Sequence, residues 1–200
     1  MPAVKATAAD PLLIDLDATL VTSHSDTEQA AGNYQGGFGF APFTASIDYG
    51  AGNGPGEELA VLLRPGGATA NNAEDHIRIF EAAIAVLPDS LYGGTGELDG
   101  EKILVRTDSA GASRKFLWYL HSRGVQFSAS YPVPVGKAHM IDWINDKKYW
   151  QPALDQDGVD RDDARAINAT PVRPPGDYPP GTPLLPPHAP PPPRPTPATP

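Results

Sequence analysis

An apolar run that carries two acids constrains this chain more than any other stretch. Residues 12–21 read LLIDLDATLV and lie between Pro11 and a polar segment, which predicts a buried strand. Side chains alternate across a strand, so Asp15 and Asp17 should share one face, opposite Leu16. Two like charges so close cost free energy, and acids are depleted from strands. We therefore interpret the pair as facing a cation or a reacting group; a solvated strand end is the alternative.

A second strand ends in an acid further along the chain. Residues 103–107, ILVRT, predict a strand that Asp108 closes, and apolar spacing predicts a helix over 112–123. The turn at 108–111 then places a carboxylate between a strand and a helix N-terminus, where exposed amides can also orient a phosphate. The alternative is that Asp108 simply caps the helix.

The remaining pattern predicts an α/β fold with a mixed sheet. Strands over 40–49 and 59–63 should form an antiparallel meander with the acidic strand, and a strand over 125–130 should run parallel to 103–107 through a right-handed helical crossover. Asn71 or Asn72 is the expected cap of a helix over 73–87. Residues 33–39 are rich in glycine and predict a loop. A short helix is expected over 137–145.

Composition limits the classes of protein that fit. The 200 residues carry a formal charge of −9 with a pI near 4.9, which counts against a self-sufficient DNA-binding protein. The absence of cysteine excludes disulfides and thiolate metal sites. No signal peptide or membrane-spanning run is apparent, so we predict a cytoplasmic protein without a membrane segment. We expect a short segment at 1–10, one core at 11–156, and an acidic, then proline-rich, disordered tail at 157–200.

One resemblance is local. The D-x-D-x-T-L spacing of Asp15, Asp17 and Thr19 is similar to the motif of haloacid-dehalogenase-like phosphatases. That resemblance implies Asp15 as nucleophile and Asp17 as acid/base. These phosphatases also need a second acidic pair after a later strand, and Asp108 is followed by SAGAS instead.

A second resemblance covers more of the chain. Taken in order, the motifs in residues 13–26, 36–40, 62–66 and 103–114 resemble transposases of the IS1380 type (IS4-like), which are DDE transposases. This resemblance implies a ribonuclease-H-like core and DNA transposition, meaning metal-dependent DNA strand cleavage and strand transfer. It also implies that carboxylates hold divalent metals, Mg²⁺ or Mn²⁺.

The resemblance assigns roles to two of these acids. Asp17 matches the first catalytic acid and metal ligand, Asp108 matches the second, and Asp15 is a neighbour. The third acid of the family is a glutamate on a later helix, and no glutamate follows Glu101 here. The sequence therefore predicts a truncated catalytic-core fragment, without the family's N-terminal segment and inactive alone unless another chain supplies the missing acid.

Partners follow from the same resemblance. Transposon-end DNA is the expected partner, with Arg64, Lys147 and Lys148 as candidate contacts, and a homodimer is a further expectation. Arg64 can equally be a surface or paired structural arginine, and the two lysines a surface patch. A non-enzymatic alternative also stays open, in which residues 190–195, PPPPRP, bind an SH3-like or WW-like groove.

Overall fold

The computed structural model describes residues 5–24, 27–49, 56–69, 72–130, 150–154, 159–168, 170, 176–183, 185 and 187–188. The chain divides into two compact units, Met1–Pro132 and Val133–Pro200.

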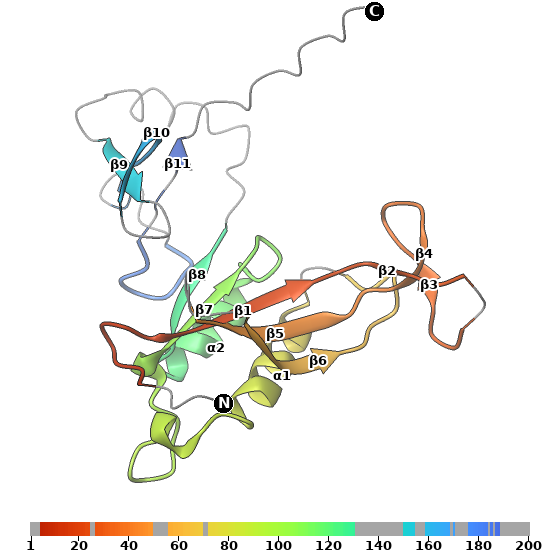
Figure 1. Cartoon of the computed structure of the whole chain (residues 1–200), viewed down its shortest axis with the longest axis horizontal. Coiled ribbons are helices and arrows are strands. Elements are labelled where there is room, and N and C mark those ends of the chain that lie inside the picture. Colours follow the sequence, from red (N-terminus) through yellow and green to blue (C-terminus); the bar gives the residue numbers. More distant parts are fainter. Residues whose placement is uncertain are drawn as a thin grey trace, which may run out of the picture. The chain divides into compact units, whose positions relative to one another are not determined.

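A mixed sheet forms the framework of the first unit (Figure 1). Within the described residues, its five strands are β1 (Leu12–Ala18), β5 (Phe43–Asp48), β6 (Glu57–Leu62), β7 (Ile103–Thr107) and β8 (Gln126–Ala129), in the order β6-β5-β1-β7-β8. The β1–β5 and β5–β6 pairs are antiparallel, whereas β7 runs parallel to both β1 and β8. The prediction of three antiparallel strands followed by parallel strands is confirmed.

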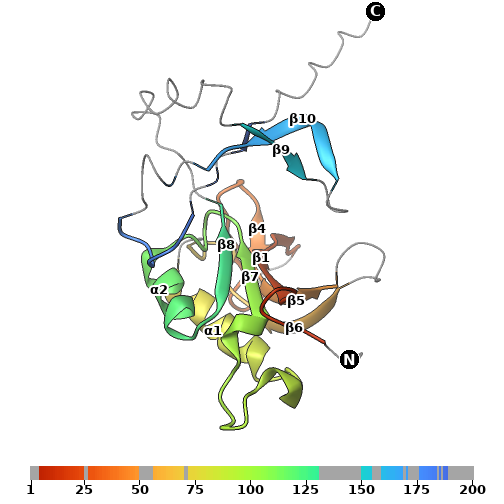
Figure 2. The ribbon, with the colours of Figure 1, turned by 90° about the vertical axis from the view of Figure 1, so that its left-hand side faces the viewer.

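The two faces of this sheet differ in chemistry. On one face, the alternate residues Ile14, Ala45 and Val105 are fully buried. The helices α1 (Ala73–Ile84) and α2 (Arg114–Ser122) lie on this side (Figure 2), with α1 against β5 and β6 and α2 against β8. Alternation sends Asp15 and Asp17 to the opposite face, as predicted. The apolar core therefore lies under the helices, and the acids lie on the other side.

Local signals explain where the helices begin. The side chain of Asn72 accepts hydrogen bonds from the backbone N–H groups of Glu74 and Asp75, which confirms one of the two expected caps. Ser113 caps α2 by accepting from the N–H of Phe116. Asp108 is therefore not the cap of α2, and its carboxylate remains at the strand end. Two 3₁₀ helices, η1 (Asp89–Leu91) and η2 (Gly100–Lys102), lie between α1 and β7.

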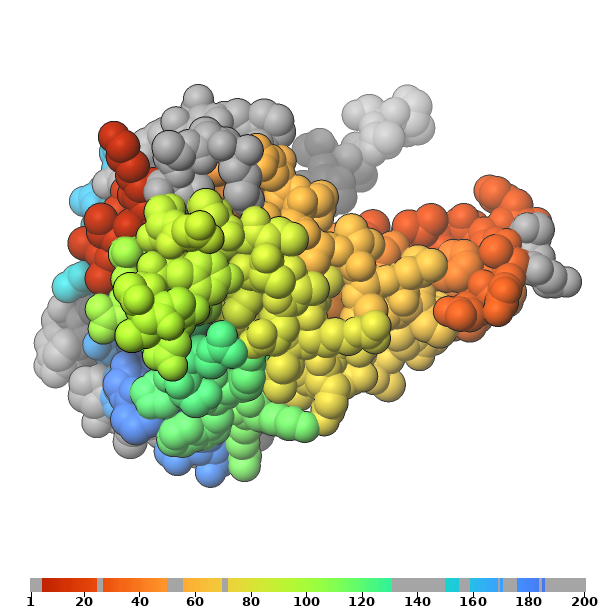
Figure 3. Space-filling model, turned by 90° about the horizontal axis from the view of Figure 1, so that it is seen from below, coloured from red at the N-terminus to blue at the C-terminus, as the bar shows by residue number. Residues whose placement is uncertain are grey.

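An arm extends the β1–β5 hairpin beyond the sheet. It contains β2 (Val21–Thr22), β3 (Ala31–Gly32) and β4 (Phe38–Phe40), paired in the order β2-β4-β3. Figure 3 shows it as a projection in red and orange. A Cβ at Gly39, whose φ is +153°, would lie 2.0 Å from the Val21 carbonyl oxygen, so glycine is required there. The predicted loop at 33–39 is thus partly strand, and the predicted strand at 40–49 is interrupted at Ala41–Pro42 because proline lacks an N–H for the ladder.

The second unit contains a small antiparallel sheet. Its strands are β9 (Gln151–Leu154), β10 (Asp160–Ala166) and β11 (Pro187–His188), in the order β11-β10-β9. The strand β10 lies within 157–200, where an acidic, then proline-rich, disordered tail is expected; for that segment as a whole, disorder stays a prediction. Arg161 neutralises Asp163 through a two-point ion pair, and Ala164 and Ile167 are buried, so this acidic segment has both charge pairing and a small apolar side.

Several predictions lie outside the described residues, namely the helix at 137–145, Lys147 and Lys148, and the proline motif at 190–195. The predicted end of the core at 156 stays a prediction, while the compact units divide after Pro132. No helix in the described ranges is long and apolar enough to cross a membrane.

Candidate active site

The parallel register of β1 and β7 brings the two predicted acids to neighbouring positions. The strands pair from Leu12 with Ile103 to Leu16 with Thr107 at constant offset. The next residue after each strand position of this last pair is Asp17 on β1 and Asp108 after β7. Because parallel strands end at the same edge of a sheet, these carboxylates lie at the carboxyl ends of two adjacent central strands. Residues far apart in the sequence thus share one end of the sheet.

Each of these carboxylates is exposed and is held locally by a single backbone donor. Oδ1 of Asp17 accepts from the N–H of Ala18 at 2.8 Å, and Oδ1 of Asp108 accepts from the N–H of Ala110 at 2.8 Å. On the other side of β1, Thr44 of β5 pairs with Asp17, and its hydroxyl donates to the Asp17 carbonyl oxygen at 3.4 Å. These bonds orient both side chains and leave carboxylate oxygens facing solvent.

A two-point ion pair lies two residues before these acids on the same two strands. Asp15 is directly opposite Arg106 in the β1–β7 register. Arg106 donates from Nε to Oδ1 and from Nη2 to Oδ2 of Asp15, both at 2.6 Å. Its Nη2 also lies 2.5 Å from Oδ2 of Asp48 on β5. One guanidinium therefore ties three neighbouring strands together on the acidic face.

The electrostatics of this group favour a permanent cation. Hydrogen bonding by Asp15 is the largest influence that raises the pKa of Arg106 above its ordinary value, and Asp48 adds to it against the opposing effect of burial. The side chains of Arg106, Asp15 and Asp48 are 42%, 34% and 37% exposed, so water screens the ion pairs substantially. The ion pair therefore acts mainly through its geometry, because the planar guanidinium of Arg106 occupies both carboxylate oxygens of Asp15.

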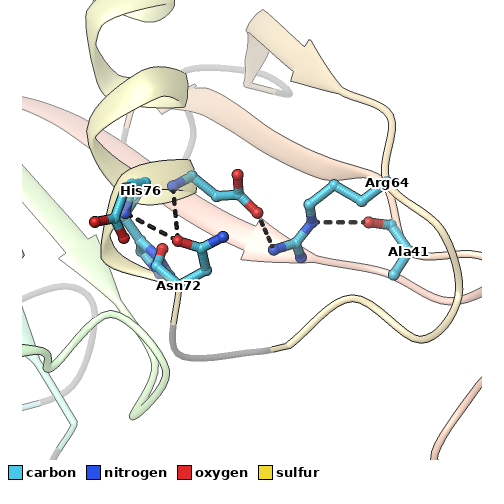
Figure 4. Close-up of polar contacts among 6 residues, drawn as sticks. Ala41, Arg64, Asn72 and His76 are labelled. Carbon is cyan, nitrogen blue, oxygen red and sulfur yellow. Dashed lines mark hydrogen bonds and ion pairs between the residues drawn. The ribbon is translucent and has the colours of Figure 1, made fainter.

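Arg64 lies on the helix side and has structural partners (Figure 4). Its side chain is nearly buried; Nε donates to the Ala41 carbonyl oxygen at 3.2 Å and Nη1 lies 3.3 Å from Oδ2 of Asp75. The guanidinium also stacks 4.7 Å from the centre of the Phe43 ring. In this arrangement Arg64 is the paired structural arginine; a contact with DNA through it stays a prediction and requires it to leave these partners.

His76 completes this buried polar group. Its Nδ1 lies 2.8 Å from the carbonyl oxygen of Asn72, which can only accept, so Nδ1 carries the proton. Burial lowers the pKa of His76 below its ordinary value, with Arg64 adding to that effect and Asp108 opposing it. The neutral ring packs between Phe43 and Phe116. His76 therefore belongs to the core rather than to the acidic face.

The donor set at the sheet edge suits a hard divalent cation. Asp17 and Asp108 offer carboxylate oxygens, and Mg²⁺ is commonly held by one or two carboxylates together with waters and substrate phosphate oxygens. Among the described residues, no group of three or more histidine or acidic side chains is placed to hold a metal. The two acids thus fit a metal that completes its coordination with water and phosphate, and a third protein ligand is absent from the described part of the chain.

The comparison with known families decides the affiliation. A family model described as transposase DDE domain group 1 matches residues 3–132, which is well over half of the chain. This chain belongs to the transposase DDE domain family. No curated protein matches it. The match ends where the first compact unit ends, so the five-stranded sheet and the arm are the parts that correspond to the family domain.

Membership gives the DDE domain its general properties. The family acts in transposition, binds DNA in doing so and generally uses divalent metal ions. The phosphatase alternative finds no support in the comparison. It also needs Asp15 as a free nucleophile, whereas both oxygens of Asp15 are bonded to Arg106.

Sequence reasoning missed two members of the acidic face of this DDE domain, Arg106 and Asp48. A signal for Arg106 was present, because it precedes Asp108 by two residues as Asp15 precedes Asp17. Once the strands are taken as parallel with the two acids in register, Arg106 must meet Asp15. Asp48 gave no such signal, because its position depends on the register of the β1–β5 hairpin.

Proposed function

We propose that the first unit is the catalytic core of a DNA transposition enzyme in which Asp17 and Asp108 hold a divalent metal, Mg²⁺ or Mn²⁺. The observation that supports this proposal is the β1–β7 register, which sets these two acids at the carboxyl ends of adjacent parallel strands. When bound, such a metal activates the attacking oxygen or stabilises the leaving oxygen in phosphodiester cleavage and joining. The affiliation with the IS1380 type and a ribonuclease-H-like core belong to the same proposal.

The residues of the chain have separate tasks in this proposal. Asp17 and Asp108 supply the metal-binding oxygens, and the backbone N–H groups of Ala18 and Ala110 fix their orientation. A metal on this acidic edge also neutralises charge that would otherwise repel DNA phosphates. DNA binding at the site should therefore depend on the metal.

We propose further that this chain does not complete strand transfer alone. By resemblance the third metal ligand is a glutamate, and no glutamate follows Glu101. With two protein ligands, the groups that act on the attacking and leaving oxygens are incomplete. A third acid from outside these residues would have to complete the site.

The direct test is the effect of metal on DNA affinity. Fluorescence anisotropy with a labelled DNA that has a free 3′-hydroxyl end should show that Mn²⁺ raises the affinity of the wild-type chain about tenfold, because a cation held by Asp17 and Asp108 would offset their charge beside the DNA phosphates. Asp17→Asn and Asp108→Asn should each remove this metal dependence. Asp89→Asn, an exposed acid in η1, is the matched control and should retain it.

Two results would contradict the proposal. Equal DNA affinity with and without Mn²⁺ would remove the proposed metal role, as would unchanged metal dependence in both active-site variants. The same DNA with a target plasmid and Mg²⁺ should give no joined product with this chain alone. Joined product that disappears in Asp108→Ala would show that the chain is complete as a catalyst.

A further inference from the structure

We propose that Arg106 is a positioning residue that selects the metal ligands at the sheet edge by keeping Asp15 out of the metal site. The inference rests on the proposed function, since it concerns the same pair, Asp17 and Asp108. It adds a role for a residue that holds neither metal nor DNA in that proposal.

The argument begins with the number of acids on one face. Asp15 and Asp17 lie on β1 on the side away from the helices, and Asp108 follows β7 at the end of the sheet where Asp17 lies. Asp48 on β5 pairs with Leu13 and is further from that end. Asp15 and Asp17 are two residues apart on β1, so they are neighbours on the same face of the strand. Asp15 is therefore the nearest further carboxylate on β1 for a cation held by Asp17, and as the described residues stand it is not placed with Asp17 and Asp108 as a third ligand.

The contacts of Arg106 keep Asp15 from acting as that ligand. Its fork engages both oxygens of Asp15, and the same Nη2 bonds Asp48. A guanidinium in this two-point geometry is a specific partner for a planar carboxylate. Within the described part of the chain, Asp17 and Asp108 each accept from one backbone N–H on one oxygen. Arg106 thus occupies both oxygens of Asp15 and leaves Asp17 and Asp108 open.

Removing the guanidinium should move the metal. In Arg106→Gln the side chain keeps a similar length and loses the charge, so Asp15 becomes available beside Asp17. Mn²⁺ affinity, measured by calorimetry, should rise about tenfold, which is within the range of coupling between neighbouring charged residues. The added affinity should depend on Asp15. Asp15→Asn should change Mn²⁺ affinity by no more than about twofold in the wild-type background and should abolish the gain in the Arg106→Gln background.

Arg123→Gln is the matched control. It removes one positive charge from the same unit, at the pair with Glu81 on the helix side, and should leave Mn²⁺ affinity unchanged. An equal rise in Arg123→Gln and Arg106→Gln would mean that net charge alone acts, and would overturn the inference. Arg106→Lys keeps the positive charge but cannot form the two-point contact with Asp15. It replaces Arg106→Gln in the test if circular dichroism shows that Arg106→Gln does not fold. It should give a smaller rise that also depends on Asp15.

The outcomes separate this inference from the proposed function. If the wild type binds Mn²⁺ through Asp17 and Asp108 but Arg106→Gln shows no gain dependent on Asp15, the proposed function stands and the selection role fails. If the wild type binds no Mn²⁺ but Arg106→Gln binds it through Asp15, the proposed metal site fails, and the selection role fails with it because the wild type has no site to select for. Absence of binding in both proteins overturns both.

Discussion

A buried guanidinium such as that of Arg64 is costly unless its charge and its N–H groups have partners. The structure supplies them from three directions, through the Ala41 carbonyl, the carboxylate of Asp75 and the face of the Phe43 ring. On the opposite face of the sheet, Arg106 has partners of another kind, two carboxylates that remain partly exposed. The first arginine stabilises the core, and the second orders an acidic surface.

The pair of Arg64 and Asp75 gives a stability prediction at the residue scale. Asp75→Asn keeps the size of the side chain but leaves the nearly buried guanidinium without its counter-charge, so the free energy of unfolding should fall by about 1–3 kcal/mol. Urea denaturation followed by circular dichroism measures this change. The neighbouring Glu74 pairs with Lys115 on the exposed side of α1, and Glu74→Gln should leave the transition nearly unchanged. An equal loss in both variants would contradict the buried-pair account.

At the scale of elements, the turn between β7 and α2 decides where Asp108 lies. Gly111 is buried in this turn, and a Cβ at that position would lie 2.1 Å from Oγ1 and 2.7 Å from Cβ of Thr107. The chain therefore passes directly over the last residue of β7. This close approach sets the path of residues 108–112 and, with it, the direction of the Asp108 carboxylate.

Gly111→Ala should disturb both the turn and the metal site. The added methyl group must displace the Thr107 side chain or the turn, and overpacking of this kind costs about 1–3 kcal/mol. We expect a lower melting temperature and weaker Mn²⁺ binding. Gly94→Ala is the control, because a Cβ there meets nothing within 4 Å. Full Mn²⁺ affinity in Gly111→Ala would show that the position of Asp108 does not depend on this contact.

Element identity was largely predictable from the sequence, while pairing details were not. The strand at 103–107 and the cap at Asn72 follow from local pattern, and both are found. The arm at 21–40 was not predicted as strand, because its strands are two or three residues long and their pairing depends on glycine at position 39. The candidate site was predictable as two acids at strand ends, whereas the Arg106–Asp48 contact needed the β1–β5 register.

At the scale of the whole molecule, the net negative charge of the chain is unfavourable for the DNA binding that its family implies. A DDE transposase domain binds DNA, yet this chain has a formal charge of −9. A metal at Asp17 and Asp108 would reconcile these two facts at the site itself. The tail gives the weakest structural signal in the sequence, because an acidic, proline-rich composition indicates disorder. Within it, the strand β10 contains the ion pair of Arg161 and Asp163 and the buried Ala164.

The central claim is that Asp17 and Asp108, far apart in sequence, hold one metal ion. Calorimetric titration of the purified chain with Mn²⁺, beside Asp17→Asn and Asp108→Asn, tests it most directly. We predict that the wild type binds and that each variant alone weakens binding about tenfold or more, since the site loses the charge of one of its two carboxylates. Binding that survives in Asp108→Asn but not in Asp17→Asn would contradict the shared site, and absence of binding in the wild type would contradict the metal role altogether.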